Sequence, residues 1–263
     1  MKTKFKSIIR AACHSFFGVV CVGVVLLIAA STQAQNLFEA DSVSGNIYEF
    51  TPGGARSTFA SGLTPAGLAF NSAGNLFVGD YGSGNIYEFT PGGARSTFAS
   101  GLSDPFALAF NSAGDLFAAD FGSGDIYEYT PGGARSTFAS GLNNPYGLAF
   151  NSAGNLFEAD RGSGDIYEYT PGGVQSTFAS GFGYPSGLAF DSAGNLFEAD
   201  EGNGVINEFT PGGARSVFAS GLDYPTFLAF QGETLPVPEP SALGLLAVGA
   251  SALLVRRRRN LAA

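Results

Sequence analysis

Five aspartates recur at near-equal spacing and are the most regular groups in this sequence that could do chemistry. They are Asp41, Asp80, Asp120, Asp160 and Asp200. Each ends an apolar segment and precedes a glycine-rich turn. Ca²⁺ takes several oxygen ligands, so a ring of carboxylates suggests a calcium site. The alternative is that each carboxylate accepts backbone N–H groups of its own turn. We predict no cofactor, with calcium as the open alternative at these five positions.

Groups suited to nucleophilic or general-base catalysis are scarce. The one His and both Cys lie within the first 34 residues. The candidates for a catalytic base acting with a metal are Glu39, Glu158 and Glu198. The repeats are nearly identical and lack one asymmetric set of catalytic groups. These observations favour a binding protein over an enzyme.

Charge is distributed unevenly along the chain. The 263 residues carry a formal net charge of −9, but residues 35–237 contain five Arg against 21 Asp and Glu, a net charge of −16. A body this acidic repels phosphate backbones, which excludes nucleic acid as a partner. Charged residues make up only 13% of the chain, and it contains 25 Phe. This composition argues against disorder.

Residues 1–34 have the layout of a secretory signal peptide. A basic start precedes an apolar run from Phe16 to Ala30 and the small-residue site Thr32-Gln33-Ala34. A retained membrane anchor is the alternative, but the run is shorter than the roughly 20 residues that a span needs. We predict export of the chain across the inner membrane.

The C-terminus has a three-part pattern. A linker at 233–241 contains Pro-Glu-Pro, and residues 242–263 form a short hydrophobic segment with a basic tail. The motif residues are Pro238, Glu239, Pro240, Arg256, Arg257, Arg258 and Arg259. The pattern resembles the PEP-CTERM sorting signal. That resemblance implies a Gram-negative bacterium that makes exopolysaccharide, processing by an exosortase, transient contact with the inner membrane, and a final location on the cell surface or in the extracellular matrix.

Residues 35–232 form an array of five repeats, spaced by 39 or 40 residues. Each repeat has four short strand-like runs separated by turn signals, which is the size of a β-propeller blade. The array begins with the last three runs of a repeat and ends with a single first run, Phe227–Phe230. We therefore predict an all-β, five-bladed β-propeller, closed by this C-terminal innermost strand joining the three N-terminal strands.

The residues of each repeat carry a family resemblance. The segments 145–150 and 154–160, followed by Ile166, resemble NHL repeats and the gluconolactonase and streptogramin-lyase propellers. The resemblance implies the propeller fold, and it makes a metal-dependent lactonase- or lyase-like enzyme the alternative function. A catalytic His of the lyase group has no counterpart here, because the repeats contain no His.

Two sets of repeated side chains have structural interpretations. The rings at 38, 50, 59 and 70, with their counterparts, are predicted to be wedges between blades. Thr-Pro-Gly-Gly suits a type II turn, since Pro fixes the first φ and Gly accepts a positive second φ. If it closes a two-residue hairpin, Glu49 lies opposite Arg56, and later repeats form the same surface pair.

The positions that differ between repeats gather in the connections at one end of the predicted propeller. We call this end the variable face, and its candidate ligand-binding residues are Tyr81, Phe106, Phe121, Asn143, Asn144, Tyr146, Arg161, Tyr184, Glu201, Asp223 and Tyr224. Exposed rings beside polar groups suit sugars. Relaxed drift in solvent-facing loops explains the variation equally well. The sequence favours an exported, surface-sorted propeller that binds an envelope or exopolysaccharide component, with a purely structural matrix protein as a further alternative.

Overall fold

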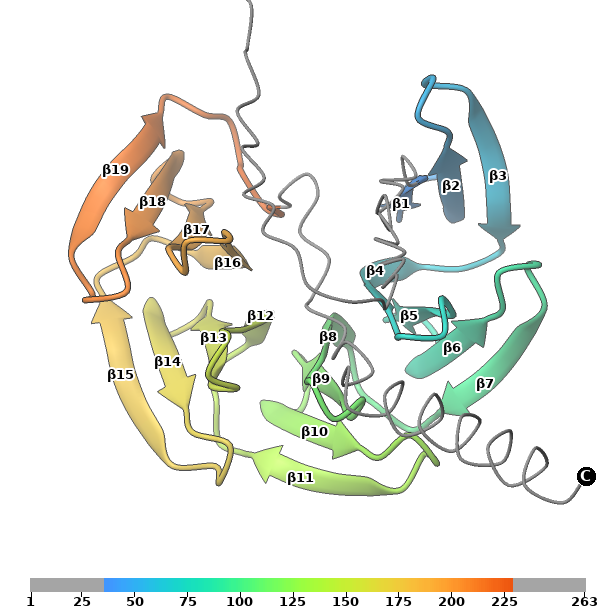
Figure 1. Cartoon of the computed structure of the whole chain (residues 1–263), viewed down its shortest axis with the longest axis horizontal. Helices are drawn as coiled ribbons and strands as arrows, with labels where there is room; N and C mark the ends of the chain where they lie inside the picture. The colour runs from blue at the N-terminus through green and yellow to red at the C-terminus, as the bar shows by residue number, and fades with distance from the viewer. Residues whose placement is uncertain (1–35, 229–263) are drawn as a thin grey trace, which may run out of the picture. The chain divides into compact units, whose positions relative to one another are not determined.

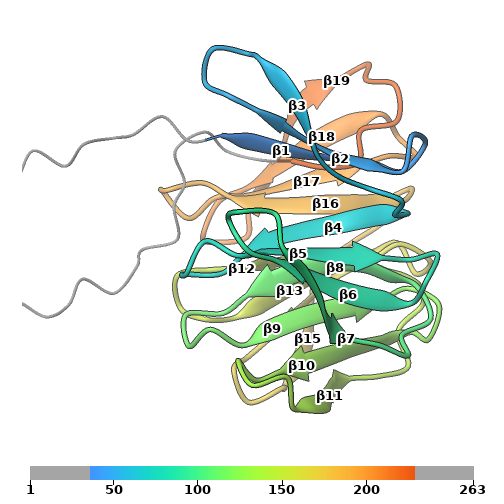
Figure 2. The ribbon, with the colours of Figure 1, turned by 90° about the vertical axis from the view of Figure 1, so that its right-hand side faces the viewer.

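The computed structural model describes residues 36–228, and these residues contain 19 β-strands and no helix. The strands form five antiparallel sheets, one of three strands and four of four strands. The sheets are arranged around a common axis (Figure 1), with the turns gathered at the two ends (Figure 2). This confirms the predicted all-β, five-bladed arrangement. Within the described range no helix is long and apolar enough to cross a membrane.

Each sheet is one blade, numbered in chain order, and the strands follow the predicted runs closely. Blade 1 contains β1 (Leu37–Asp41), β2 (Asn46–Phe50) and β3 (Arg56–Ser61), and blade 2 contains β4 (Pro65–Phe70), β5 (Leu76–Asp80), β6 (Asn85–Phe89) and β7 (Arg95–Ala99). Blade 3 contains β8 (Pro105–Phe110), β9 (Leu116–Asp120), β10 (Asp125–Tyr129) and β11 (Arg135–Ala139). Blade 4 contains β12 (Pro145–Phe150), β13 (Leu156–Asp160), β14 (Asp165–Tyr169) and β15 (Gln175–Ser180). Blade 5 contains β16 (Pro185–Phe190), β17 (Leu196–Asp200), β18 (Val205–Phe209) and β19 (Arg215–Ser220).

Glycine lets the innermost strands approach one another closely around the axis. A Cβ atom added to Gly67 of β4 would lie 2.5 Å from the carbonyl oxygen of Phe106 in β8. Gly147 of β12 meets the carbonyl of Ser186 in β16 even more closely. Because such contacts are shorter than real Cβ atoms make, a side chain at these positions must push the blades apart.

Aromatic rings join neighbouring blades, as predicted for the wedges. Phe77 of blade 2 packs edge-on against Phe98 of its own blade and Phe110 of blade 3, with ring centroids 5.0 Å apart in both pairs. The same arrangement recurs around Phe117 and Phe157. Each such edge-to-face pair contributes about 0.5–1.5 kcal/mol beyond the burial of its area.

The Glu–Arg cross-strand pairing predicted from the Thr-Pro-Gly-Gly turn is wrong. Thr51 N–H donates to the Ala55 carbonyl at 3.0 Å, so the loop contains three residues rather than two. The positive φ of 81° falls on Gly54, the second glycine, as in a type I turn followed by a bulge. The register moves by one residue, so Arg56 lies opposite Phe50 and Glu49 opposite Ser57. Arg56 instead stacks on the ring of Tyr48, with its guanidinium carbon 4.5 Å from the ring centroid.

The predicted closing strand is described only in part. Phe227 and Leu228 belong to no strand, and Ala229 and Phe230 lie outside the described residues. The segment 226–228 nevertheless lies against Gly187 of β16, where the next innermost strand is expected. Phe227 stands where the other repeats have Gly or Ala, so this segment carries a large ring at a position that is small in the other innermost strands. Pairing of this segment with β1 stays a prediction.

We expect Gly187→Ala to destabilise the propeller about as much as Gly147→Ala does. In each variant the new methyl group meets the backbone of the neighbouring innermost segment, which costs about 1–3 kcal/mol of the free energy of unfolding. Urea unfolding of both variants measures this. If only Gly147→Ala is destabilised, residues 226–228 are not held in the innermost position.

Candidate functional site

Hydrogen bonds between blades build the variable face. The connection that leaves one blade passes beside the turn after the second strand of the next blade. Phe121 N–H donates to the carbonyl of Asp104 at 2.9 Å, and Glu201 N–H donates to that of Tyr184 at 3.1 Å. These bonds fix the residue after each strand-end aspartate next to the incoming loop. The variable positions of adjacent blades therefore lie side by side.

The five strand-end aspartates anchor these loops. Asp160 accepts the backbone N–H of Asn143 at 2.7 Å from the incoming loop and that of Ser163 at 2.9 Å from its own turn. Asp200 likewise accepts N–H groups of Gly183 and Asn203. In the incoming loops, Thr64 N–H donates to Asp80, and the N–H groups of Ser103 and Asp104 donate to Asp120. Asp41 accepts the N–H groups of Val43 and Ser44 in its own turn. Within residues 36–228 no three acidic side chains converge as metal ligands.

Five rings meet at the variable face, and we call them the aromatic cluster. Its members are Tyr81, Phe106, Phe121, Tyr146 and Phe227. Phe106 lies between Tyr81 and Tyr146, with centroids 5.5 Å and 5.0 Å away. Tyr146 in turn stacks on Phe227 at 5.9 Å. Rings from three blades and the C-terminal segment thus form one continuous patch.

A charged pair completes the patch. The guanidinium carbon of Arg161 lies 5.1 Å from the ring centroid of Tyr146 and 5.3 Å from that of Tyr184. Arg161 also forms an ion pair with Glu201 at 2.8 Å, and Glu201 accepts a long hydrogen bond from the Ser186 hydroxyl at 3.5 Å. Burial raises the pKa of the Tyr146 phenol above its ordinary value. The two charges compensate each other, so the pair does not require a charged ligand and can bond to the hydroxyl groups of a neutral one.

The structure brings together seven of the eleven predicted residues of the variable face. They are Tyr81, Phe106, Phe121, Tyr146, Arg161, Tyr184 and Glu201. Asn144 has a positive φ of 64°, and its amide donates to the Phe121 carbonyl at 3.4 Å, so it shapes the loop. Asn143 lines a separate pocket. Asp223 and Tyr224 are exposed and have no interaction with the cluster among the described residues.

Two contributors, Phe227 and Ser186, are not among the residues predicted for the variable face. The repeat pattern places Phe227 in a closing strand, and its size at a Gly or Ala position is the signal of its different role. Ser186 occupies the repeat position of Phe106 and Tyr146, and it is fully buried. Aligning the repeats on the residues after each loop proline identifies both positions.

The three glutamates considered for catalysis do not come together. Glu39 is exposed on blade 1. Glu158 and Glu198 are fully buried on different blades, and the side chain of each shares a face with the apolar residues that pack against the preceding blade. Both carboxylate oxygens of Glu158 lack a hydrogen-bond partner. Burial, with a contribution from Asp160, raises the pKa of Glu158 well above its ordinary value.

Glu198 belongs to a buried polar chain that the other blades lack. It accepts a hydrogen bond from the Asn207 amide at 2.8 Å, and the Asn207 carbonyl accepts one from Arg215 Nε at 3.1 Å. Burial raises the pKa of Glu198 to about 8, while the Asn207 bond and the charge of Arg215 oppose part of that rise. The folded protein therefore holds a proton on Glu198 at neutral pH.

We expect Glu198→Gln to flatten the pH dependence of stability. The native pKa of about 8 exceeds the ordinary value of 4.5, so stability falls as the pH rises through this interval. The slope from one such group is at most about 1.4 kcal/mol per pH unit. Urea unfolding between the two pKa values measures it. Glu39→Gln, at the same repeat position but exposed, is the control; an unchanged slope in Glu198→Gln would contradict the assignment.

We expect the melting temperature to be the same in Ca²⁺ and in EDTA. The strand-end carboxylates already accept N–H bonds from their turns and loops, and a cation would have to displace these donors. Calorimetry in both solutions measures this. A large upward shift with Ca²⁺ would show that the aspartates bind the ion.

Part of the chain matches a known family. Residues 236–259 match the PEP-CTERM protein-sorting motif, which contains the predicted Pro238-Glu239-Pro240 and the four C-terminal Arg. This segment lies outside the described residues, as does the predicted signal peptide 1–34. The motif implies recognition by an exosortase. No curated protein matches the chain in sequence.

Several solved structures share the fold. A gluconolactonase from Xanthomonas campestris is 19% identical, with a TM-score of 0.68, and the match covers 75% of this chain and 76% of that one. The nidogen/laminin complex contains a chain that is 24% identical, with a TM-score of 0.69 and coverage of 75% and 82%. Virginiamycin B lyase from Staphylococcus aureus is 14% identical, with a TM-score of 0.64 and coverage of 74% and 71%. These similarities establish the fold alone. The chain is thus a five-bladed β-propeller with a C-terminal PEP-CTERM protein-sorting motif, the mark of an exported and sorted protein.

Proposed function

We propose that this protein is a surface-sorted binding propeller that holds an envelope or exopolysaccharide component on its variable face without catalysing a reaction. The observation that carries the proposal is the aromatic cluster with the Arg161–Glu201 pair beside it. Rings offer flat surfaces to the C–H faces of sugars, and the adjacent polar groups can bond to hydroxyls.

Exposure of the surrounding side chains supports binding of a large ligand. Tyr184, Tyr224 and Phe227 are 52%, 72% and 57% exposed, so their rings are available to solvent. Tyr146 is only 7% exposed and supports the patch from below. A long polymer contacts such a broad surface through several sugar units in succession.

Charge narrows the class of ligand. The propeller region carries a net charge of −16, and the Arg161 charge is compensated by Glu201. An anionic polymer would be repelled by this field. We therefore propose a neutral polysaccharide as the ligand.

The proposed location follows from the two ends of the chain. The sorting motif at 236–259 implies exosortase recognition, and the predicted signal peptide provides entry to the export route. After processing, the propeller would lie on the cell surface or in the extracellular matrix. This location brings the variable face to the proposed polysaccharide.

We expect Tyr184→Ala combined with Tyr224→Ala to weaken binding to isolated matrix polysaccharide by about tenfold or more. Both rings are exposed, so their removal takes away stacking surface while the fold is preserved. Co-sedimentation of the purified protein with the polysaccharide measures the change. Val174→Ala, in an exposed turn at the opposite end of blade 4, is the control. Unchanged binding of the double variant, or no binding by the wild-type protein, would refute the proposal.

A further inference from the structure

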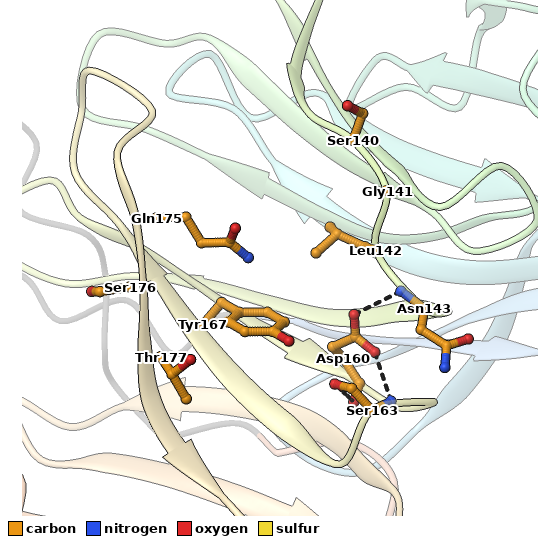
Figure 3. Close-up of a pocket in the computed structure, with 10 residues that line it drawn as sticks. All are labelled: Ser140, Gly141, Leu142, Asn143, Asp160, Ser163, Tyr167, Gln175, Ser176 and Thr177. Carbon is orange, nitrogen blue, oxygen red and sulfur yellow. Dashed lines mark hydrogen bonds between the residues drawn. The ribbon is translucent and has the colours of Figure 1, made fainter.

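Blade 4 contains a pocket that is separate from the aromatic cluster. It has a volume of about 370 Å³ and opens between the connection 140–143 and the two outer strands β14 and β15 (Figure 3). Tyr167 forms one wall, with Gln175 beside it, and Asn143 and Asp160 lie at the other side. Ser163 and Thr177 add to a predominantly polar lining.

The sister blades show which chemical group fits against this wall. In blades 1, 2 and 3 an Arg guanidinium lies over the ring at the repeat position of Tyr167. The pairs are Arg56 on Tyr48 at 4.5 Å, Arg95 on Tyr87 at 4.9 Å, and Arg135 on Tyr127 at 4.8 Å. These distances are those of cation–π contacts. The same backbone thus places a guanidinium over this ring in three of the five blades.

Blade 4 keeps the ring but has lost the guanidinium. Gln175 replaces the Arg of the sister blades, and its amide is directed to the Tyr169 hydroxyl at 3.0 Å. The Tyr167 hydroxyl donates to Asp165 at 3.2 Å, which holds the ring in the orientation seen in the sister blades. The pocket therefore occupies the space beside a ring whose usual cation is missing.

Blade 5 departs from the pattern in a different way. Asn207 replaces the ring there, and Arg215 stacks instead on Phe182 at 4.3 Å. Blades 1, 2 and 3 thus contain both the Tyr and the Arg over it. Blade 4 contains the Tyr without the Arg, and in blade 5 the Arg stacks on a different ring. Among the five blades that the structure describes, blade 4 is the one with the Tyr but no Arg at the partner position.

The charge of the pocket also suits a cation. The Asp160 carboxylate lines it, and no Arg or Lys does. Side-chain hydroxyls of the lining can accept N–H bonds from a planar guanidinium, which presents five donors. A neutral sugar carries no positive charge that the Asp160 carboxylate could attract.

We propose that this pocket binds a guanidinium group from another molecule, seated on Tyr167 as the Arg side chains are seated in the sister blades. The group is either a small guanidinium compound or an Arg side chain of a polypeptide. The inference is independent of polysaccharide binding, because only Asn143 is common to the two sites.

The proposal is tested by titrating the purified protein with L-argininamide and with the peptide Gly-Gly-Arg-Gly-Gly, followed by calorimetry. We expect saturable binding of argininamide with one site per chain. Lysinamide and glucose should bind at least about tenfold more weakly, because neither has a planar cation. Binding of the peptide as well assigns the site to polypeptide ligands, and exclusion of the peptide assigns it to small compounds.

Three variants test whether the guanidinium binds in this pocket on the ring of Tyr167. Gln175→Arg restores the sister side chain, fills the pocket and should abolish argininamide binding while the fold is kept, as the sister blades show. Gln175→Ala is the matched control and should retain binding, because it leaves the pocket open. Tyr167→Leu should weaken binding by about tenfold through loss of the cation–π contact. Absent binding to the wild-type protein, equal binding by Gln175→Arg, or glucose binding in place of argininamide would overturn the proposal.

Discussion

The variable face depends on one repeated interaction, the acceptance of backbone N–H groups by the aspartate at the end of each blade's second strand. Asp160 illustrates it: one carboxylate oxygen bonds to its own turn and the other to the loop arriving from blade 3. The N–H of the next residue, Arg161, donates to the carbonyl of Asn144 in that loop. A single carboxylate thus fixes both loops, and side chains on either side of it can change without loss of the backbone geometry.

That division between fixed backbone and free side chains explains how near-identical repeats produce unequal blades. At the middle of the second strand the residues are Val78 and Ala118 in blades 2 and 3 but Glu158 and Glu198 in blades 4 and 5. The two glutamates differ in turn, because Asn207, itself bonded to Arg215, donates to Glu198, whereas Glu158 has no hydrogen-bond partner. Substitutions on an unchanged sheet have therefore produced one buried carboxylate with a single bonded oxygen, Glu198, and one with no bonded oxygen, Glu158.

The sequence predicts the repeat, the four-stranded blades and the end at which variable residues gather, because period-two patterns and turn residues act locally. It failed at the Thr-Pro-Gly-Gly turn, where a three-residue loop moved the register by one position and separated Glu49 from Arg56. It also could not show that Tyr146 would be buried beneath Arg161, since this requires contacts between blades. Four of the five rings of the aromatic cluster are among the predicted residues of the variable face, but Phe227 and the layering of the rings are not.

The Arg–Tyr stacks show why a one-residue register change matters for function. With Glu49 opposite Arg56, each Arg would be an exposed partner of a carboxylate on the surface. In the actual register it lies opposite Phe50 and covers the ring of Tyr48, as its counterparts do in blades 2 and 3. The Arg is then part of the packing, and replacing it by Gln175 leaves a space rather than an unpaired charge. The pocket of blade 4 is a consequence of that register.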